Sequence, residues 1–477
     1  MFEINKRDGL ARLGKIKTKH GVLDTPTLLP VVNPKILTLS MEELKECGAQ
    51  GLITNSYIIY KNSELKNIAE EKGVHGLLNW DGPIMTDSGT FQSHVYGEID
   101  MQPDEILNFQ KKIEVDIGTV LDVFCEPETR FEDAKKELEE TQRRIEESDK
   151  NKGSIFLAAP IQGGRHLDLR LKAAEMASQT NAEVFPIGGV VPLMEKNNFE
   201  KLAEVIIAAK KGLDISRPVH LFGCGHPMLF ALASFLGCDL FDSSSYAKFA
   251  SRDSLMFTWG TKNLEELEEF PSEFSAAPDI TVNQLKKMEK KERQRIIAKH
   301  NLIVSFTEIR RVKQAIHDGL LWELVENRLR TSPALMKVFE ILKRERDWFA
   351  EFEPAYRYKT PIKTGLESDN RPIFSKLANS FKSGDMTHPY FGKVPNHLSE
   401  TYPFHPGLLQ DDIEGWKMQS WDVKRVRTIL DYQFGKGIGK TFTNGETDLV
   451  ISRKTKRLRN LLLDGEHVAS LSHRRGM

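Results

Sequence analysis

The sequence predicts an α/β protein: a closed (β/α)8 barrel, also called a TIM barrel, followed by C-terminal α+β modules. In the first two-thirds of the chain, eight short apolar runs alternate with amphipathic stretches. The apolar runs are continuous, which is typical of parallel strands covered by helices on both faces. An open doubly wound sheet is the alternative, but no Gly-x-Gly-x-x-Gly motif follows the first strand.

The expected elements follow one another along the chain. The strands are expected at 27–32, 51–55, 83–86, 117–123, 155–161, 184–187, 219–222 and 238–241. The clearest helices between them are expected at 131–149, 166–178, 198–211 and 226–236. Ser40 and Glu43 have the spacing of a capping box, which predicts a helix start after the first strand.

Composition limits the class of protein. A chain of 477 residues exceeds one ordinary core, so a large domain with one or two smaller ones is expected. Lys and Arg number 67 against 68 Asp and Glu, a balance that requires no particular partner. Four scattered cysteines without a C-x-x-C pair indicate reduced core thiols. Since no apolar run reaches about twenty residues and the N-terminus lacks a signal-peptide pattern, we expect a cytoplasmic protein without membrane contact.

Composition also predicts the domain boundaries. We expect the barrel at 1–335, with an insertion near 262–302, an α+β module at 336–422 and a third segment at 423–477. The region 286–330 is helical and highly charged, and a solvated helix face explains most of these charges at least as well as RNA contact. From residue 421 to the end, twelve Lys and Arg stand against six Asp and Glu. This local surplus is the main charge asymmetry of the chain.

Two carboxylates at the ends of separate strands are the strongest chemical signal. Asp87 ends the third expected strand, and Asp242 ends the eighth. A carboxylate at the end of a buried strand is costly unless it is hydrogen-bonded or reactive. Paired carboxylates are what acid/base or nucleophilic chemistry on a glycosidic bond requires. The active site of such a barrel lies at the carboxyl ends of its strands.

Other strands end in polar or glycine residues that suit a flat base. Asp122 and Gln162 offer an acceptor and an amide to the hydrogen-bonding edge of a purine-like ring, and Gly189 permits close backbone approach. Any one of these residues is explained by a helix cap or a tight turn. Their occurrence on consecutive strands indicates one shared site instead. Aromatic side chains that could stack on a base, and histidines that a rim position or a cap explains equally well, are Phe91, Phe222, His94 and His226.

Six motifs, in order, closely resemble those of tRNA-guanine transglycosylases. They are MTDSGTFQ (85–92), LDVF (121–124), IQGG (161–164), IGGVVPLME (187–195), HLFGCGHPM (220–228) and GCDLFDSSSYAKFA (237–250). The resemblance covers essentially the whole chain, and the helical stretch at 300–330 is similar to the archaeal branch. It implies exchange of guanine 15 in the D-loop of tRNA for 7-cyano-7-deazaguanine, on the route to archaeosine.

The resemblance also implies roles for individual residues. Asp242 would be the nucleophile that attacks C1′ of the target ribose and forms a covalent intermediate. Asp87 would protonate the departing base and then take a proton from the incoming one. The loop 190–193 has the archaeal form and is consistent with a nitrile substituent. The base pocket would contain Ser88, Phe91, Asp122, Gln162, Gly189, Val190 and Phe222.

The sequence departs from the family at its structural zinc site. The family holds this ion with three cysteines and a histidine after the barrel. Here Ser272, Phe274 and Ala277 occupy the cysteine positions, and only His300 remains. One histidine cannot hold a tetrahedral zinc, so we predict no metal and no cofactor, with Phe274 and its neighbours packing there. Such sites supply folding energy rather than catalytic groups, so the loss is compatible with activity.

The end of the chain resembles the entry to an RNA-binding PUA domain. Its basic residues are a candidate phosphate-binding set, although a charged edge strand would look similar. They are Arg453, Lys454, Lys456, Arg457 and Arg459. The sequence stops at Met477, where such a domain is only partly built, so we expect a separate polypeptide to complete it, with a truncated chain as the alternative. The resemblance also implies a homodimer.

Two other functions are compatible with the barrel. A catalytically silent tRNA-binding paralogue or subunit would be expected to lack one of the two aspartates, and both are present. A barrel hydrolase would admit water rather than hold a base, whereas Asp122, Gln162 and the glycine pair at 188–189 favour a held base. The sequence therefore favours base exchange.

Overall fold

The computed structural model describes residues 2–90, 101–271, 276–353, 366–373 and 375, and the backbone of two short strands at 387–388 and 392–393. The chain divides into two compact units. The first comprises Met1–Arg7, Ala11–Ile316 and Asn327–Ile341, and the second comprises Asp8–Leu10, His317–Glu326 and the residues from Leu342 on. None of the helices in the described ranges combines the length and the apolar character that a membrane crossing needs.

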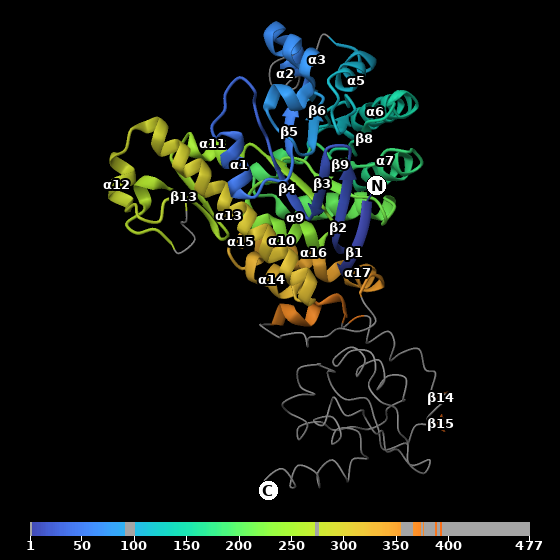
Figure 1. Cartoon of the computed structure of the whole chain (residues 1–477). Helices are drawn as coiled ribbons and strands as arrows, with labels where there is room; N and C mark the ends of the chain where they lie inside the picture. Colours follow the sequence, from blue (N-terminus) through green and yellow to red (C-terminus); the bar gives the residue numbers. More distant parts are fainter. Residues whose placement is uncertain are drawn as a thin grey trace. The chain divides into compact units, whose positions relative to one another are not determined.

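The first unit contains the predicted barrel (Figure 1). Its parallel strands are β4 (Thr27–Pro30), β5 (Leu52–Asn55), β6 (Ile84–Asp87), β7 (Ile117–Thr119), β8 (Phe156–Ala158), β9 (Phe185–Ile187), β10 (Val219–Leu221) and β11 (Leu240–Ser243). They pair in two runs, β5-β6-β7-β8 and β4-β11-β10-β9. Parallel bridges join β4 to β5 through Val31 and Ile53, and β8 to β9 through Ala158 and Val184. The ring is therefore closed, and the eight predicted strands are confirmed.

Helices follow the strands and surround the ring (Figure 1). They are α1 (Met41–Cys47), α2 (Ser56–Lys61), α3 (Ser63–Leu78), α5 (Pro103–Lys112), α6 (Phe131–Asn151), α7 (Leu167–Ser178), α8 (Val191–Glu195), α9 (Phe199–Gly212), α10 (Pro227–Phe235) and α11 (Ser245–Ala250). The four predicted helices correspond to α6, α7, α9 and α10. The capping box is also confirmed: Glu43 N–H donates to Ser40 Oγ at 3.2 Å, and Ser40 N–H donates to Glu43 Oε2 at 3.0 Å.

An antiparallel sheet that the sequence analysis did not predict lies at the amino end of the barrel. Its strands are β1 (Phe2–Asp8), β2 (Ala11–Thr18) and β3 (Gly21–Thr25), in the order β1-β2-β3. Ile16 and Leu23 of this sheet pack into the same apolar cluster as Leu29 and Met85 of the barrel strands. A Cβ on Gly51, just before β5, would lie 2.7 Å from Leu23 Cδ2. The β2–β3 hairpin therefore closes this end of the barrel core.

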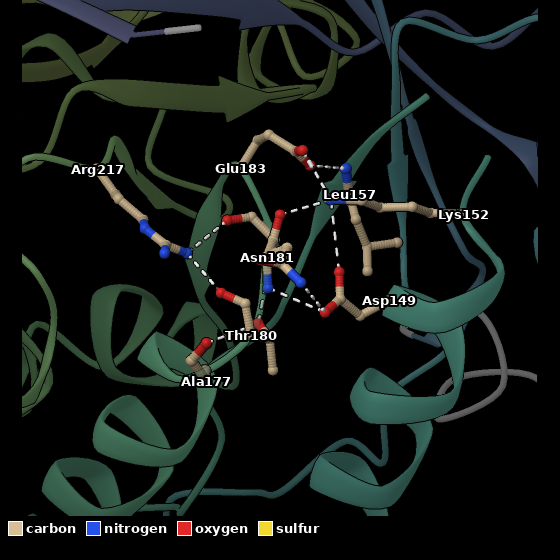
Figure 2. A network of polar contacts seen from close by, with 9 residues as sticks. Asp149, Lys152, Leu157, Ala177, Thr180, Asn181, Glu183 and Arg217 are labelled. Carbon is tan, nitrogen blue, oxygen red and sulfur yellow. Dashed lines mark hydrogen bonds and ion pairs between the residues drawn. The ribbon is translucent and has the colours of Figure 1, made fainter. Parts of the chain in front are cut away.

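A polar network holds the loops at the amino ends of β8 and β9 (Figure 2). Glu183 accepts hydrogen bonds from Leu157 N–H at 2.7 Å and from Lys152 Nζ at 2.7 Å. Arg217 donates to the carbonyl oxygens of Thr180 at 2.8 Å and Ala182 at 2.9 Å. These bonds satisfy backbone groups that the short strands leave without partners.

The barrel is followed by a hairpin and a series of helices. These are β12 (Ser254–Phe257), β13 (Gly260–Asn263), η1 (Leu264–Glu266), α12 (Val282–Lys287), α13 (Lys290–Asp318), α14 (Leu321–Leu329), α15 (Pro333–Met336) and α16 (Val338–Arg344). The predicted helical character of 286–330 is confirmed. Some of its charges are internal: Glu308 is fully buried and accepts from Arg328 Nε at 2.7 Å, and Arg293 pairs with Asp253 at 2.8 Å. RNA contact by the remaining charges stays untested.

The second unit contains α17 (Arg346–Glu351), η2 (Leu366–Asn370) and the antiparallel pair β14 (Thr387–His388) and β15 (Gly392–Lys393). Its described interior is polar as well as apolar. Arg371 is almost fully buried and pairs with Glu323, while Ser368 donates to Glu326 at 3.1 Å. The predicted domain boundaries near 335 and 422 stay predictions, and the segment 423–477 lies outside the described residues.

Candidate active site

The predicted site residues that the structure describes all lie at or just after the carboxyl ends of barrel strands. Asp87 ends β6, and Asp242 is the last residue but one of β11. Because the strands are parallel in one closed ring, these ends share one rim. The residues in the loops after β6, β7, β8, β9 and β10 are Ser88, Asp122, Gln162, Gly189, Val190 and Phe222. Phe91, His94 and the five basic residues at 453–459 lie outside the described residues.

The carboxyl group of Asp87 is fixed by neighbours on β5 and on its own loop. Gly89 N–H donates to Oδ1 at 3.1 Å, and Asn55 Nδ2 donates to Oδ2 at 3.3 Å. Ser56 Oγ donates to the backbone carbonyl of Asp87 at 2.8 Å. Asn55 also caps α2 by accepting from Ile58 N–H at 2.9 Å. One amide side chain thus links the start of a helix to the position of this carboxyl group.

The environment of Asp87 favours its protonated form. Burial, opposed by the Gly89 hydrogen bond and reinforced by the charges of Asp122 and Asp242, raises the pKa of Asp87 from 3.8 to about 6. A carboxyl group with a pKa near the working pH can both donate and accept a proton. Asp122 and Asp242 are therefore both close enough to Asp87 for their charges to disfavour its ionisation.

Asp242 differs because only one of its oxygens is engaged. Gly223 N–H donates to Oδ1 at 2.9 Å, and His220 Nε2 lies 2.9 Å from the same oxygen. Among the described residues, none donates a hydrogen bond to Oδ2. The side chain of Asp242 is 13% exposed, whereas that of His220 is fully buried. Asp242 therefore presents one held oxygen and one available oxygen.

The sequence analysis missed His220, although a signal was present. In a strand, residues two apart point to the same face, and His220 is two residues before the predicted site residue Phe222. The two rings meet edge to face with their centroids 4.7 Å apart. In register, His220 pairs with Leu240, which belongs to the barrel core. His220 thus lies inside the barrel, below the rim that carries Asp242.

Asp122 and Gln162 form a connected polar pair. Gln162 Nε2 donates to Asp122 Oδ2 at 2.6 Å, and both side chains are buried. Burial raises the pKa of Asp122, although the hydrogen bond from Gln162 opposes that shift. Within the described part of the chain, Gln162 Oε1 is buried and accepts no hydrogen bond. This oxygen is free to accept an N–H of a bound base.

The glycine turn after β9 is shaped around this pair. Gly189 has φ +66°, and a Cβ there would lie 2.5 Å from the carbonyl oxygen of Cys125 and 3.0 Å from Gln162 Oε1. A Cβ on Gly188 would lie 2.6 Å from Gln162 Nε2. A larger residue at either position would displace the amide, so the turn needs glycine for both space and conformation.

Ser88 links the loops after β6 and β7. Its Oγ lies 3.1 Å from Thr90 Oγ1, which in turn donates to the backbone carbonyl of Asp122 at 3.3 Å. Both hydroxyls are buried. In this structure, Ser88 therefore acts on the site through Thr90 by connecting the loop of Asp87 to the loop of Asp122.

A second residue that the sequence analysis missed is Arg170 on α7, which is fully buried. Its Nε donates to Gly164 O at 2.9 Å, and its Nη1 donates to Ile161 O at 2.6 Å and Gly188 O at 2.8 Å. The guanidinium thus ties the loop of Gln162 to the loop of Gly189. Burial lowers the pKa of Arg170 to about 10, so it stays charged at neutral pH. Its signal was a charged residue on an otherwise apolar helix face.

Two histidines near the site have structural contacts. His226 is the N-cap of α10, where Nδ1 accepts from Met228 N–H at 3.3 Å and Nε2 lies 3.0 Å from Thr261 Oγ1. The cap interpretation of His226 is confirmed. His300, the remaining residue of the family's zinc set, is buried on α13 with Nε2 3.0 Å from the carbonyl oxygen of Met256. Burial lowers the pKa of His300 to about 4.

The described residues of the expected zinc set, Ala277 and His300, offer at most one ligand. A tetrahedral site needs four ligands, and the nitrogen of His300 that faces Met256 is already engaged. Ala277 carries no donor atom, and Ser272 and Phe274 lie outside the described residues. The packing of Phe274 in place of the ion therefore stays a prediction.

Comparison with known proteins adds an independent finding. Residues 7–334 match the family described as queuine tRNA-ribosyltransferase, and residues 424–477 match the patch-forming domain C2 of tRNA-guanine transglycosylase. Proteins named tRNA-guanine(15) transglycosylase are similar over most of their length. The one from Thermococcus onnurineus is 42% identical, covering 100% of this chain and 83% of the relative. The one from Methanosarcina acetivorans is 44% identical, covering 85% and 87%.

Proposed function

The chain belongs to the tRNA-guanine transglycosylase family, and we propose that it is a pentosyltransferase that exchanges a guanine of tRNA for a free 7-deazaguanine. Its relatives are named for guanine 15, and we assign that position to this chain as well. The incoming base is 7-cyano-7-deazaguanine, a precursor of archaeosine. The observation that carries the proposal is the position of Asp87 and Asp242 at the carboxyl ends of two barrel strands that share one rim, with Asp122 in the loop after β7.

The exchange proceeds as a double displacement at C1′ of the target ribose. Asp242 attacks C1′, and the C1′–N9 bond breaks as its electron pair moves to the base. The protonated carboxyl of Asp87 gives its proton to the departing guanine, which leaves as a neutral molecule. The new deazaguanine then loses its N9 proton to Asp87 and attacks C1′, and the ester electrons return to the Asp242 carboxylate. Two inversions give net retention, as in retaining glycosidases.

The contacts of Asp242 support its role as nucleophile. Oδ1 receives the Gly223 N–H and lies beside His220, whereas Oδ2 is available. A carboxylate held through one oxygen keeps its other oxygen aimed at a fixed point, which lowers the entropic cost of attack. We therefore assign Oδ2 as the attacking atom, and His220 and Gly223 as its positioning residues.

The environment of Asp87 supports its role as acid and base. With a pKa of about 6, part of its population carries a proton near neutral pH. Binding of a base would remove the remaining water and favour the protonated form further. A carboxyl that alternates between donor and acceptor suits a reaction in which both the departing and the incoming groups are purine-like bases.

The pair of Asp122 and Gln162 supports recognition of a guanine-type edge. Asp122 can accept N–H donors of the base, and Gln162 Oε1 accepts one more. Leaving such buried groups unpaired is costly, so a base without matching donors would be rejected. Val190 and Phe222 supply apolar surface next to the base. Phe91 is proposed as a stacking residue from the sequence alone.

The proposal also includes properties outside the candidate site that depend on sequence resemblance alone. These are phosphate contacts by the basic residues at 453–459, a homodimer and a cytoplasmic location. The family match at 424–477 names a patch-forming domain C2, and the PUA-like assignment of the same segment stays a prediction.

A catalytically silent tRNA-binding paralogue is the second candidate function. It would bind tRNA without needing a carboxyl group whose pKa is raised toward neutrality. The raised pKa of Asp87 and the available Oδ2 of Asp242 both favour catalysis over binding alone.

The test is exchange of radiolabelled guanine into unmodified tRNA, together with trapping of the covalent adduct in denaturant. Wild-type protein and Asp81→Asn, which alters an exposed carboxylate paired with Lys45, should exchange guanine and form an adduct. Asp242→Asn should form none while still binding tRNA, and 7-cyano-7-deazaguanine should compete with guanine. An adduct that persists in Asp242→Asn contradicts the assigned nucleophile. Tight tRNA binding without exchange by the wild type supports the silent paralogue.

A further inference from the structure

Three potential metal ligands meet at the amino end of the barrel. His20 lies in the turn between β2 and β3, His75 lies on α3, and Asp116 directly precedes β7. His20 Nδ1 is 3.1 Å from Asp116 Oδ1, and His75 Nε2 is 3.0 Å from Asp116 Oδ2. The ligand atoms of all three residues lie within 4.8 Å of one another. The sequence analysis and the proposed reaction assign no role to any of them.

The carboxylate is oriented before any ion binds. Asp116 Oδ2 accepts from Ile84 N–H at 2.9 Å, and Oδ1 accepts from His20 N–H at 3.1 Å. Its side chain is fully buried. Burial acts to raise its pKa, but the hydrogen bonds from His75 and Ile84 outweigh this effect and hold the pKa of Asp116 well below its usual range. Outer hydrogen bonds of this kind are what orient metal-binding carboxylates in proteins.

The two imidazoles flank this carboxylate. Their ring centroids are 3.8 Å apart with an interplanar angle of 38°. Imidazole is the commonest metal ligand in proteins. The side chains of His20 and His75 are 25% and 15% exposed, so solvent reaches both rings.

We propose that His20, His75 and Asp116 bind one divalent metal ion and that this ion is zinc. Two nitrogens and one carboxylate oxygen, completed by water, form a common zinc ligand set, whereas magnesium and calcium prefer oxygen ligands alone. Ligand atoms about 2.1 Å from a tetrahedral zinc lie roughly 3.4 Å apart. The two nitrogen–oxygen distances here are close to that value. On binding, each imidazole directs a lone pair at the ion and carries its proton on the other ring nitrogen.

The position of the site indicates a structural role. It joins the β2–β3 hairpin, helix α3 and the start of β7, which are distant in the sequence and adjacent in the fold. Asp116 precedes β7 and Asp122 follows it, so the site and the proposed active site lie at opposite ends of this strand. The ion would therefore stabilise the fold and take no part in base exchange. Binding to the folded state alone raises stability by mass action.

The test uses the full chain, stripped with EDTA and dialysed against zinc chloride. Four proteins are compared: wild type, His20→Ala, His75→Gln and the control His317→Ala. His75→Gln retains a side chain that can donate to Asp116 but is a poor zinc ligand. The control removes an exposed histidine that pairs with Asp318. Bound zinc is measured by equilibrium dialysis and stability by thermal unfolding.

We expect wild type and His317→Ala to bind one zinc equivalent more than the two site variants. Loss of a ligand should weaken binding by more than the roughly 10–100-fold that loss of an outer-shell partner causes. Zinc should raise the melting temperature of wild type and control only. Cobalt should give the visible absorption of a four-coordinate ion in the same two proteins. Equal zinc binding and equal thermal shifts in all four would overturn the proposal and show a hydrogen-bonded cluster only.

Guanine exchange, measured in parallel, separates this proposal from the proposed function. At assay temperatures below the melting temperature, removal of zinc should leave guanine exchange by the wild type unchanged. Absence of exchange in every protein would count against the proposed reaction without affecting the metal site. Zinc-dependent exchange would contradict the structural role assigned to the ion.

Discussion

Asp87 and Asp116 lie at opposite ends of the neighbouring strands β6 and β7. Their environments shift the pKa of the carboxyl group in opposite directions. Asp116, before β7, accepts hydrogen bonds from backbone N–H groups and contacts two histidines, so its pKa lies well below the usual range. Asp87, at the end of β6, is half-buried near other carboxylates, and its pKa is raised to about 6. The first environment stabilises a charge, and the second makes a charge costly.

Strand β11 shows a contrast in hydrogen bonding within four residues. Asp239, just before the strand, is buried against Arg12, whose Nε donates at 2.9 Å, and accepts from Val219 N–H at 2.8 Å. Asp242, on the strand, has one oxygen to which no described residue donates. The amino end of the barrel therefore satisfies its carboxylates, whereas the carboxyl end leaves acceptors available for a substrate. We therefore expect mutations at the carboxyl end to change guanine exchange and mutations at the amino end to change stability.

Asp87→Asn should have the largest effect on catalysis. Exchange should fall on the order of 10²–10⁴-fold, because the amide cannot transfer the proton. For wild type, kcat/KM for tRNA should decline as pH rises above about 6, and this decline should be absent from the residual activity of the variant. Binding of tRNA and stability at pH 7 should not fall. Exchange at the wild-type rate would remove Asp87 as the acid and base.

Asp116→Asn should have the complementary effect. The variant loses the buried carboxylate that accepts hydrogen bonds from His20 and Ile84, so its free energy of unfolding should fall by about 3 kcal/mol at pH 7. Urea denaturation measures the loss, and guanine exchange by the folded fraction should remain within about twofold of wild type. A variant of unchanged stability that has lost exchange would show that this end of the barrel takes part in the reaction.

Substitution of His220 should have an intermediate effect that depends on the replacement. His220→Leu removes the polar neighbour of Asp242 Oδ1 and should slow adduct formation about 10–100-fold with little change in tRNA affinity. His220→Gln retains a donor and should recover part of that rate. His300→Gln alters a buried histidine outside the site and serves as the control. If His220→Leu and His220→Gln slow adduct formation equally, His220 acts through packing alone.

The smallest expected effect is on the pH dependence of stability, which should differ between Asp87 and Asp116. Asp87 has a folded pKa above its unfolded value of 3.8, so its contribution to stability is present below pH 3.8 and is lost as pH rises through about 6. The loss should not exceed about 3 kcal/mol. The pKa of Asp116 is lowered, so its contribution is present above pH 3.8 and is lost as pH falls below that value. Urea denaturation from pH 3 to 7 should show each trend disappear in the corresponding Asn variant.

The sequence predicted features that depend on local patterns. Continuous apolar runs identified all eight strands, and a carboxylate at the end of such a run identified Asp87 and Asp242. Features that depend on distant pairing were missed. The sheet β1–β3 has half-polar strands, and only its position against Gly51 and Pro83 shows that it closes the barrel. Arg170 and His220 each carry a weak local signal in the sequence, but their contacts with the site loops depend on the fold.

The metal-site residues illustrate the same limit. His20, His75 and Asp116 are separated by at least forty residues from one another, and their meeting depends on a hairpin, a helix and a strand that pack together. The zinc positions that the family resemblance implies, in contrast, can be located in the sequence, where Ser272, Phe274 and Ala277 stand in place of cysteines. Clusters assembled from distant segments require the fold to be known.

Peptide mass spectrometry of the trapped complex is the most direct test of the proposed reaction. The full chain is quenched during exchange, the tRNA is removed with nuclease, and the protein is digested with a protease. The account predicts a ribose-linked mass on the peptide that contains Asp242, and its absence when Asp242→Asn is used. The same mass on the peptide that contains Asp87, or exchange without any linked peptide, would contradict it.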